Sequence, residues 1–482
     1  MNAPPPADLT GPTAAAELRR RFDAQRAAHA REPNPGLAVR RDRLARLLAL
    51  VREREAAFVA AIDRDFGHRS SHETRLAELY IVASEARHAM AHLRRWMRPR
   101  RVRTPIQLLP GRAYVAPQPL GVAGIVSPWN YPVQLALAPA VAALAAGNRA
   151  MLKPSEVTPA TSALLAEAIA SRFAEDEFTV VTGGAETGAE FARLPFDHLF
   201  FTGSTAVGRI VAKSAAENLT PVTLELGGKS PAFVDASADL ALVAPRIAAG
   251  KLLNAGQTCI APDYALVPAA LADAFVAAIA GAVRRLYPDP LRSDDYTSIV
   301  NERHYARLVA LIDEARAKGA RVVTVPDGAV PDPETRRIPP TLLVGVDDGM
   351  QAMREEIFGP ILPIETYATI DDGIAAVSRR PRPLALYVFA QDRAARERIL
   401  ARTIAGGVTV NDTLWHFAHE GLPFGGVGAS GIGAYHGETG FRTFSHMKGV
   451  FVQPRVAAAK LLHPPYGATF EKVLSLLKRV AG

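Results

Sequence analysis

The sequence predicts a protein of the α/β class, in which strands and helices alternate along the chain. Five short apolar runs between Val122 and Leu226 are separated by helix-like segments, and a second alternation continues from Ala232 to Asn411. Strand and helix at this spacing indicate a parallel sheet that is covered on both faces. The chain has 482 residues, 49% of them apolar and 22% charged, which suits a globular protein of two or three domains.

The first hundred residues are expected to be helical. Apolar residues recur at intervals of three and four over residues 14–31, 36–66 and 71–97, while charges fill the other faces. From Thr104 to Leu120 the pattern changes to short runs that prolines and glycines interrupt. This change predicts a β-hairpin that projects from the main body.

The two alternations define the remaining elements. In the first, strands are expected at 122–126, 149–153, 178–182, 198–202 and 222–226. In the second, strands are expected at 232–235, 264–267, 321–324, 341–344, 385–389 and 408–411, and helices at 240–254, 269–285, 302–317, 370–378 and 393–402. A strand at 449–453 and an amphipathic helix at 470–479 complete the tail.

Charge and cysteine content exclude several classes of protein. Lys and Arg outnumber Asp and Glu by 56 to 48, and this net charge of +8 is accompanied by no aromatic-basic motif of a nucleic-acid-binding protein. The single cysteine, Cys259, forbids an intrachain disulfide and favours a cytoplasmic setting. The apolar stretch 135–146 is too short to cross a bilayer, and the chain does not start like a signal peptide. We therefore expect a soluble protein without a membrane span.

Two residues are candidates for covalent and acid–base chemistry. Cys259 follows the end of a helical pattern at Gly256 and precedes Pro262, so its thiol is expected on an accessible turn, although a lone cysteine is often only a small core residue. Glu225 lies at the carboxyl end of a predicted strand, where open α/β sheets bind their ligands, and an exposed carboxylate paired with a lysine is the alternative.

Several turns that follow predicted strands suit a dinucleotide. The turn from Gly203 through Ser204 and Thr205 to Gly208 opens a helix whose free N–H groups would attract a diphosphate, although its spacing departs from GxGxxG. The segment 426–431 does match GxGxxG, yet without a flanking strand and helix it is interpreted as a loop. Lys153 and Glu156 follow another strand and could hold the hydroxyls of a ribose.

Three further segments are ambiguous when each is taken alone. Asn130 stands between two prolines, where a rigidly held amide could stabilise an oxyanion. Glu356 lies in a pair of carboxylates before a Gly-Pro turn. His416 and His419 have helical spacing, but Pro423 follows too soon for the helix that a metal site of that kind needs, and no metal is expected.

Taken together, these motifs resemble the aldehyde dehydrogenase superfamily over nearly the whole chain. The resemblance runs from Pro128-Trp129-Asn130 through Glu225 and Cys259 to Pro423-Phe424-Gly425-Gly426. Details resemble the class 3 branch, at 256–264 and 430–437, and the bacterial coniferyl aldehyde dehydrogenases, at 440–446 and 462–467. The implied fold is a Rossmann-like NAD-binding domain (1–103 and 121–226), an α/β catalytic domain (227–443), oligomerisation strands (104–120 and 444–456) and a tail (457–482).

The resemblance also implies a reaction. Cys259 would attack an aldehyde, Asn130 would bind the oxyanion, and Glu225 would activate the water that hydrolyses the thioester to the acid. It further implies a homodimer and an aromatic or medium- to long-chain aldehyde as substrate. The alternatives are a coenzyme A-acylating enzyme, against which Glu225 argues, and, from other classes, a nucleic-acid-binding protein or a metal hydrolase.

The same resemblance assigns the cofactor contacts. Trp129, Lys153 and Glu156 belong to the NAD-binding set, together with Gly203, Ser204, Thr205 and Gly208. Glu356 and Phe358 would position the nicotinamide ribose. Glu156 should repel a 2′-phosphate, so NAD is expected, with NADP as a second cofactor that class 3 enzymes often accept.

Overall fold

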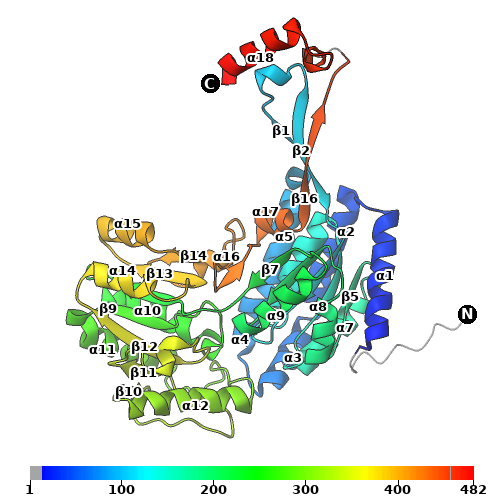
Figure 1. Ribbon diagram of the computed structural model, residues 1–482. Helices are drawn as coiled ribbons and strands as arrows, with labels where there is room; N and C mark the ends of the chain where they lie inside the picture. The colour runs from blue at the N-terminus through cyan, green and yellow to red at the C-terminus, as the bar shows by residue number, and fades with distance from the viewer. Residues whose placement is uncertain (1–12, 456–457, 482) are drawn as a thin grey trace, which may run out of the picture.

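The computed structural model describes residues 13–455 and 458–481, and these residues form three sheets with helices packed around them (Figure 1). Two of the sheets build the body of the molecule. The third projects from it as an arm. The α/β class and the parallel sheets that the sequence predicts are confirmed.

The first hundred residues are helical, as expected, but two of the predicted helices are interrupted. The helix expected over 36–66 is broken at Arg54, whose φ of −101° and ψ of 12° leave the helical range, so that both halves can turn an apolar face to the core. The helix expected over 71–97 contains a π-helical stretch, Arg75–Tyr80. The N-terminal helices are α1 (Ala15–Arg31), α2 (Leu37–Glu53), α3 (Glu55–Phe66), α4 (Ser71–Thr74) and α5 (Ile81–Trp96).

The first body sheet has six strands in the order β15-β7-β6-β3-β4-β5, and all five strands predicted for it are present. They are β3 (Val122–Val126), β4 (Arg149–Lys153), β5 (Phe178–Val180), β6 (His198–Thr202) and β7 (Val222–Glu225), which are mutually parallel. The sixth strand, β15 (Gly431–Ile432), pairs antiparallel with β7 and comes from a stretch expected in the other domain. The helices between these strands are α6 (Gln134–Ala146), α7 (Pro159–Ala170), α8 (Ala185–Ala192) and α9 (Thr205–Ala216).

The second body sheet has seven strands in the order β10-β11-β12-β9-β8-β13-β14. One of them, β12 (Ile361–Tyr367), was not predicted, because Pro363 lies in its middle and a proline normally argues against a central strand. The others are β8 (Pro231–Val234), β9 (Tyr264–Pro268), β10 (Arg321–Thr324), β11 (Thr341–Val344), β13 (Ala385–Phe389) and β14 (Gly407–Val410). The helices of this half are α10 (Leu240–Leu252), α11 (Ala272–Leu286), α12 (Glu302–Ala317), α13 (Gln351–Arg354), α14 (Ile370–Ser378), α15 (Arg393–Arg402) and α16 (Trp415–Ala418).

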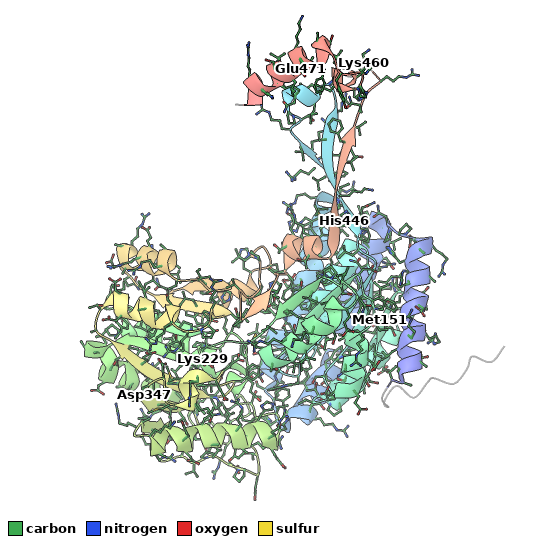
Figure 2. The ribbon with its side chains drawn as sticks, in the orientation of Figure 1. Met151, Lys229, Asp347, His446, Lys460 and Glu471 are labelled. Atoms are coloured by element: carbon green, nitrogen blue, oxygen red, sulfur yellow. The ribbon has the colours of Figure 1, made fainter. Side chains whose placement is uncertain are left out.

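The arm is a three-stranded antiparallel sheet. The hairpin expected over 104–120 starts earlier, since β1 (Arg100–Val102) is the strand that pairs with β2 (Arg112–Pro119). The strand predicted at 449–453 is β16 (Ser445–Val452), which follows α17 (Gly437–Thr443) and pairs with β2 along its whole length. Helix α18 (Ala468–Ala481) lies at the tip of the arm (Figure 1). Figure 2 shows Lys460 and Glu471 at this tip and His446 where the arm leaves the body.

No helix among the described residues combines the length and the apolar character that a membrane crossing requires.

Candidate active site

A cavity of about 250 Å³ lies between the two body sheets. Its wall combines residues that are far apart in the sequence and that come from both halves of the molecule. Three of the candidates, Asn130, Glu225 and Cys259, meet in it. The other lining residues are Pro128, Trp129, Leu135, Thr202, Gly203, Ser204, Leu226, Gly227, His304, Arg307, Glu356, Phe358, Phe424 and Tyr435.

Cys259 follows an unusual turn at the end of α10. Asn254, Ala255 and Gly256 all have positive φ angles, of 55°, 51° and 76°, so three consecutive residues adopt the left-handed conformation. A side chain at Gly256 would also approach the carbonyl oxygen of Gly359 to 2.3 Å, which only glycine avoids. The turn directs the chain away from the helix and places Cys259, a residue of intermediate exposure, in the cavity wall.

Buried hydrogen bonds hold this turn in place. Both carboxylate oxygens of Glu73 accept a hydrogen bond from the N–H of Asn254, at 3.1 and 3.0 Å. The side-chain amide of Asn254 donates to the backbone oxygens of Asn130 and Gln257, at 3.0 and 3.1 Å. The segments that carry Asn130 and Cys259 are therefore tied to each other directly.

The Asn130 side chain is buried and points toward the same turn. Its Nδ2 donates to the backbone oxygen of Gln257 at 3.2 Å, which uses one of its two hydrogens. The second hydrogen is free to bind an oxygen in the cavity. Beside it, the ring of Trp129 contacts His304 and Phe358 at centroid distances of 5.0 and 5.4 Å.

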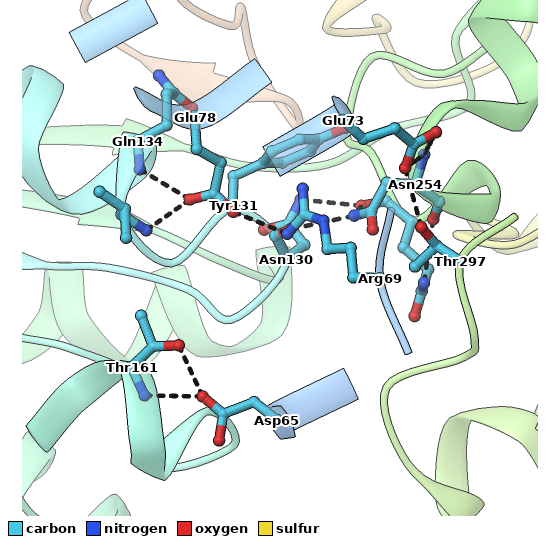
Figure 3. Close-up of polar contacts among 12 residues, drawn as sticks. Asp65, Arg69, Glu73, Glu78, Asn130, Tyr131, Gln134, Thr161, Asn254 and Thr297 are labelled. Atoms are coloured by element: carbon cyan, nitrogen blue, oxygen red, sulfur yellow. Dashed lines mark hydrogen bonds and ion pairs between the residues drawn. The ribbon is translucent and has the colours of Figure 1, made fainter. Parts of the chain in front are cut away.

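A buried ion pair supports this arrangement (Figure 3). Arg69 Nη1 binds Glu78 at 2.7 Å, with both side chains fully buried, and also donates to the backbone oxygen of Asn130 at 3.1 Å. The other oxygen of Glu78 accepts from the N–H groups of Val133 and Gln134, at 2.7 and 3.1 Å, at the start of α6. A carboxylate at a helix N-terminus also interacts favourably with the helix dipole.

We expect the substitution Arg69→Met to destabilise the protein strongly. It leaves the Glu78 carboxylate buried without its cation, and a broken pair of this kind costs about 3–5 kcal/mol. Arg393→Met is the matched control, because the Arg393–Glu397 pair is exposed and such pairs contribute about 0.2–1 kcal/mol. Urea midpoints of both variants measure the difference. Equal midpoints would show that the Arg69–Glu78 pair does not support the site.

Glu225 ends strand β7 and faces the cavity. The antiparallel pairing of Gly431 with Glu225 and the bond from the Gly203 N–H to the Glu225 backbone oxygen, at 3.0 Å, fix its backbone. Neither carboxylate oxygen has a hydrogen-bond partner among the described residues, and burial raises the pKa of Glu225 well above its usual range. The alternative of an exposed carboxylate paired with a lysine is wrong.

The thiol of Cys259 shares this environment. Burial raises its pKa, and the nearby carboxylates of Glu356 and Glu225 add to the shift. The thiolate is therefore disfavoured at neutral pH until a positive charge or a base lies close to the sulfur.

The residues assigned to the diphosphate lie in the turn before α9 and in its first turn, and only two of them line the cavity. Gly203 and Ser204 line the cavity, and the Ser204 hydroxyl caps the helix by accepting from the N–H of Val207. Thr205 instead donates to the backbone oxygen of Ala429 at 3.3 Å. Gly208 is in the first turn of α9, where a side chain would approach Leu226 to 2.6 Å, so this glycine permits close packing of the helix on the sheet.

The remaining cofactor candidates occupy two places. Lys153 ends β4, and its Nζ binds Glu156 at 2.7 Å outside the cavity. Glu356 and Phe358 are in the cavity wall. Burial and the nearby Asp263 raise the pKa of Glu356 to about 8, and its Oε1 has no partner among the described residues. A buried oxygen of this kind suits the hydroxyl of a bound ribose.

Comparisons with known proteins agree with this geometry. Residues 12–450 match the model of the aldehyde dehydrogenase family. The chain belongs to the aldehyde dehydrogenase family. It is 48% identical over 458 residues to a probable coniferyl aldehyde dehydrogenase of Pseudomonas aeruginosa, covering 95% of each chain, and 39% identical to the 4,4′-diaponeurosporen-aldehyde dehydrogenase of Staphylococcus aureus, covering 96% of this chain and 99% of the relative. The structure of the substrate-bound state of Staphylococcus aureus AldH superposes with a TM-score of 0.91 at 38% identity, covering 95% of this chain and 99% of that one.

Membership of the aldehyde dehydrogenase family establishes the class of reaction. The protein is an NAD(P)-dependent aldehyde dehydrogenase that oxidises an aldehyde to the carboxylic acid. The coenzyme A-acylating alternative finds no support in these relatives.

Several residues that line the cavity of this aldehyde dehydrogenase are not among the site residues predicted from its sequence. His304 and Arg307 stand one turn apart on α12, and Arg307 donates to the backbone oxygens of Glu356 and Ile357. Their helical spacing is the only signal for them, and any exposed helix face shows the same spacing. Phe424 and Tyr435 flank the GxGxxG segment 426–431, which is a loop as interpreted except for Gly431, the first residue of β15.

His416 and His419, which were considered above as metal ligands, form other contacts. His416 is buried, and its Nδ1 lies 2.8 Å from the hydroxyl of Thr409, while His419 binds the N–H of Gly421. Across the described ranges, 13–455 and 458–481, no group of three or more His, Cys, Asp or Glu side chains could hold a metal ion.

Proposed function

We propose that this aldehyde dehydrogenase oxidises an aromatic aldehyde of the coniferyl type with NAD, through a thioester on Cys259. The observation that carries the proposal is the meeting of Cys259, Glu225 and Asn130 in one cavity. Phe424 and Tyr435, the aromatic lining residues that are not assigned to the cofactor, supply walls that suit a flat substrate. The names of the relatives point to the same substrate class.

The first half of the reaction forms the thioester. The Cys259 thiol first loses its proton to solvent. The thiolate attacks the aldehyde carbon, and the resulting oxyanion accepts hydrogen bonds from the free Asn130 Nδ2–H and the Cys259 N–H. The loss of one such donor typically lowers the rate by about 10²–10³. A bound nicotinamide would accept the hydride of the broken C–H bond as the C=O bond re-forms, and the acyl group would remain on the sulfur.

The second half releases the acid. The Glu225 carboxylate takes a proton from a water molecule whose oxygen attacks the thioester carbon. Its buried and unpaired oxygens leave it free to accept that proton. The electron pair of the broken C–S bond returns to Cys259, which is then ready for the next aldehyde.

We assign the cofactor contacts from the resemblance to the aldehyde dehydrogenase family. Gly203 and Ser204 would face the diphosphate, Lys153 and Glu156 the adenosine ribose, and Glu356 and Phe358 the nicotinamide ribose, with Trp129 beside them. Thr205 and Gly208 would support the turn. Because Glu156 would repel a 2′-phosphate, we expect a higher kcat/KM with NAD than with NADP.

The substrate proposal is tested with a series of aldehydes. We expect kcat/KM, followed by NADH absorbance, to be higher for cinnamaldehyde-type aromatic aldehydes than for short aliphatic ones, because burial of a ring adds binding free energy. A series in which short aliphatic aldehydes have the higher kcat/KM would contradict the aromatic assignment. It would leave the reaction class unchanged.

We also propose a cytoplasmic homodimer. The projecting arm exposes apolar side chains that a second subunit could cover, and a reduced catalytic thiol suits the cytoplasm. The exposed residues are Val102, Ile106, Leu108, Leu109, Met447, Phe451 and Val452. Light scattering should give twice the mass of one chain, and a mass of one chain would contradict the dimer.

A further inference from the structure

Buried polar groups without partners belong to two residues that line the cavity, Glu225 and Tyr435, and to Gln134, which lies near Tyr435. The hydroxyl of Tyr435, the amide Nε2 of Gln134 and both carboxylate oxygens of Glu225 have no hydrogen-bond partner among the described residues. Tyr435 is 1% exposed, Gln134 2% and Glu225 3%. A buried polar group without a partner destabilises the folded protein, so such a cluster is expected to bind a molecule that takes part in the reaction.

Tyr435 is held firmly beside Glu225. Its N–H and C=O exchange backbone hydrogen bonds with Phe424, at 2.7 and 2.9 Å, and its ring packs edge-on against Phe200 at 4.9 Å. The same loop contains Gly431, which pairs with Glu225 itself. Both side chains therefore keep their positions through one loop, and both line the cavity with Cys259.

The side chain of Gln134 lies near the Tyr435 hydroxyl. Gln134 is the first residue of α6, where its N–H is fixed by Glu78, as Figure 3 shows. Its side-chain amide lies close enough to Tyr435 to lower the pKa of that phenol, while burial and the charge of Glu225 raise it. An amide N–H only donates, so Gln134 favours an orientation in which the Tyr435 oxygen faces the amide and its O–H faces the cavity.

We propose that Tyr435 holds the hydrolytic water together with Glu225, and that Gln134 is a positioning residue for Tyr435. The inference rests on the proposed role of Glu225. The Tyr435 O–H donates to one lone pair of the water, Glu225 accepts one of its protons, and the second lone pair attacks the thioester carbon. The carbon–oxygen bond forms, the carbon–sulfur bond breaks, its electron pair returns to Cys259, and Tyr435 keeps its own proton throughout.

The aldehyde oxygen is a poorer match for this hydroxyl. That oxygen already has two donors, the Asn130 amide and the Cys259 N–H. Of the charged groups near the Tyr435 hydroxyl, Glu225 raises its pKa the most, and Cys259 comes second. Tyr435, Glu225 and Cys259 line the same cavity, so a water bound there can reach both the base and the carbon of the thioester.

The test uses Tyr435→Phe, which removes only the oxygen atom. With full-length enzyme, NAD and an aromatic aldehyde, NADH formation in the first turnover should stay within about twofold of the wild type. Loss of the acyl group from the protein, followed by rapid quench and intact mass, should slow roughly tenfold, as expected for one lost hydrogen bond to the nucleophile. Gln134→Leu should slow the same step by a smaller factor.

Two controls separate this role from a structural one. Tyr367→Phe removes a buried hydroxyl that donates to the Val234 backbone oxygen at 2.7 Å and that does not line the cavity, so both rates should match the wild type. In a Glu225→Gln background, Tyr435→Phe should add little, because the two residues hold one water.

The other outcomes are equally informative. An equal slowing of both steps in Tyr435→Phe would place the hydroxyl in substrate binding, and no slowing of either would give it no part in hydrolysis. Both results overturn the inference. If Glu225→Gln alone releases the acyl group at the wild-type rate, the proposed base fails, and that failure is visible without any Tyr435 variant.

Discussion

Replacing Cys259 by serine is expected to abolish NADH formation from every aldehyde, a loss on the order of 10⁴-fold or more. A serine hydroxyl lacks the acidity and the nucleophilicity of a thiol, and no other cysteine exists in the chain to take over. Steady-state assays at a high concentration of the variant, with the aldehyde still in excess, measure the residual rate of NADH formation.

The control for this variant is cofactor binding. Fluorescence titration with NADH should give an unchanged Kd, because the Lys153–Glu156 pair and the α9 turn are untouched. In the wild type, alkylation with iodoacetamide should stop activity when one label per chain has reacted. Turnover that persists after complete labelling would remove Cys259 from the reaction.

Replacing Glu225 by glutamine is expected to separate the two halves of the reaction. The first turnover should still produce about one NADH per chain, while the following steady state should fall by about 10²–10⁴-fold, because general base catalysis is lost. Stopped-flow absorbance at the NADH band shows both phases in one trace.

The pH dependence provides a second measurement on the same residue. Burial raises the pKa of Glu225, so in the wild type deacylation should be fast above that pKa and should be lost as the pH falls through it. In Glu225→Gln this dependence should disappear from the deacylation rate. The matched control is Glu156→Gln, which should change the KM for NAD and leave the ratio of burst to steady state as it is. A Glu225→Gln enzyme without a burst would contradict the assignment.

Much of the fold and the centre of the site could be predicted because their signals are local. Strands β3 to β7 are short apolar runs between helix-like segments, Glu225 is the last residue of β7, and Cys259 and Asn130 lie in turns that follow a helix and a strand. A residue at the carboxyl end of a parallel strand reaches the ligand side of the sheet in any open α/β fold. These local signals indicated the three residues one at a time, and the resemblance to the aldehyde dehydrogenase superfamily joined them in one site.

Features that depend on distant contacts could not be predicted in the same way. Strand β12 forms despite Pro363 because β11 and β9 pair with it on both sides. The Arg69–Glu78 pair joins the loop between α3 and α4 and the π-helical stretch Arg75–Tyr80 to the start of α6, and no periodicity in the sequence shows which arginine is buried. Tyr435 reaches the cavity only because its loop pairs with β7 and bridges to Phe424.

The proposed thioester can be observed directly. Glu225→Gln is mixed with NAD and an aromatic aldehyde, quenched in acid, and weighed intact and as peptides by mass spectrometry. We predict a mass increase equal to the acyl group, located on the peptide that contains Cys259 and absent when NAD is omitted. An NADH burst without this adduct, or an adduct on any other residue, would contradict the account.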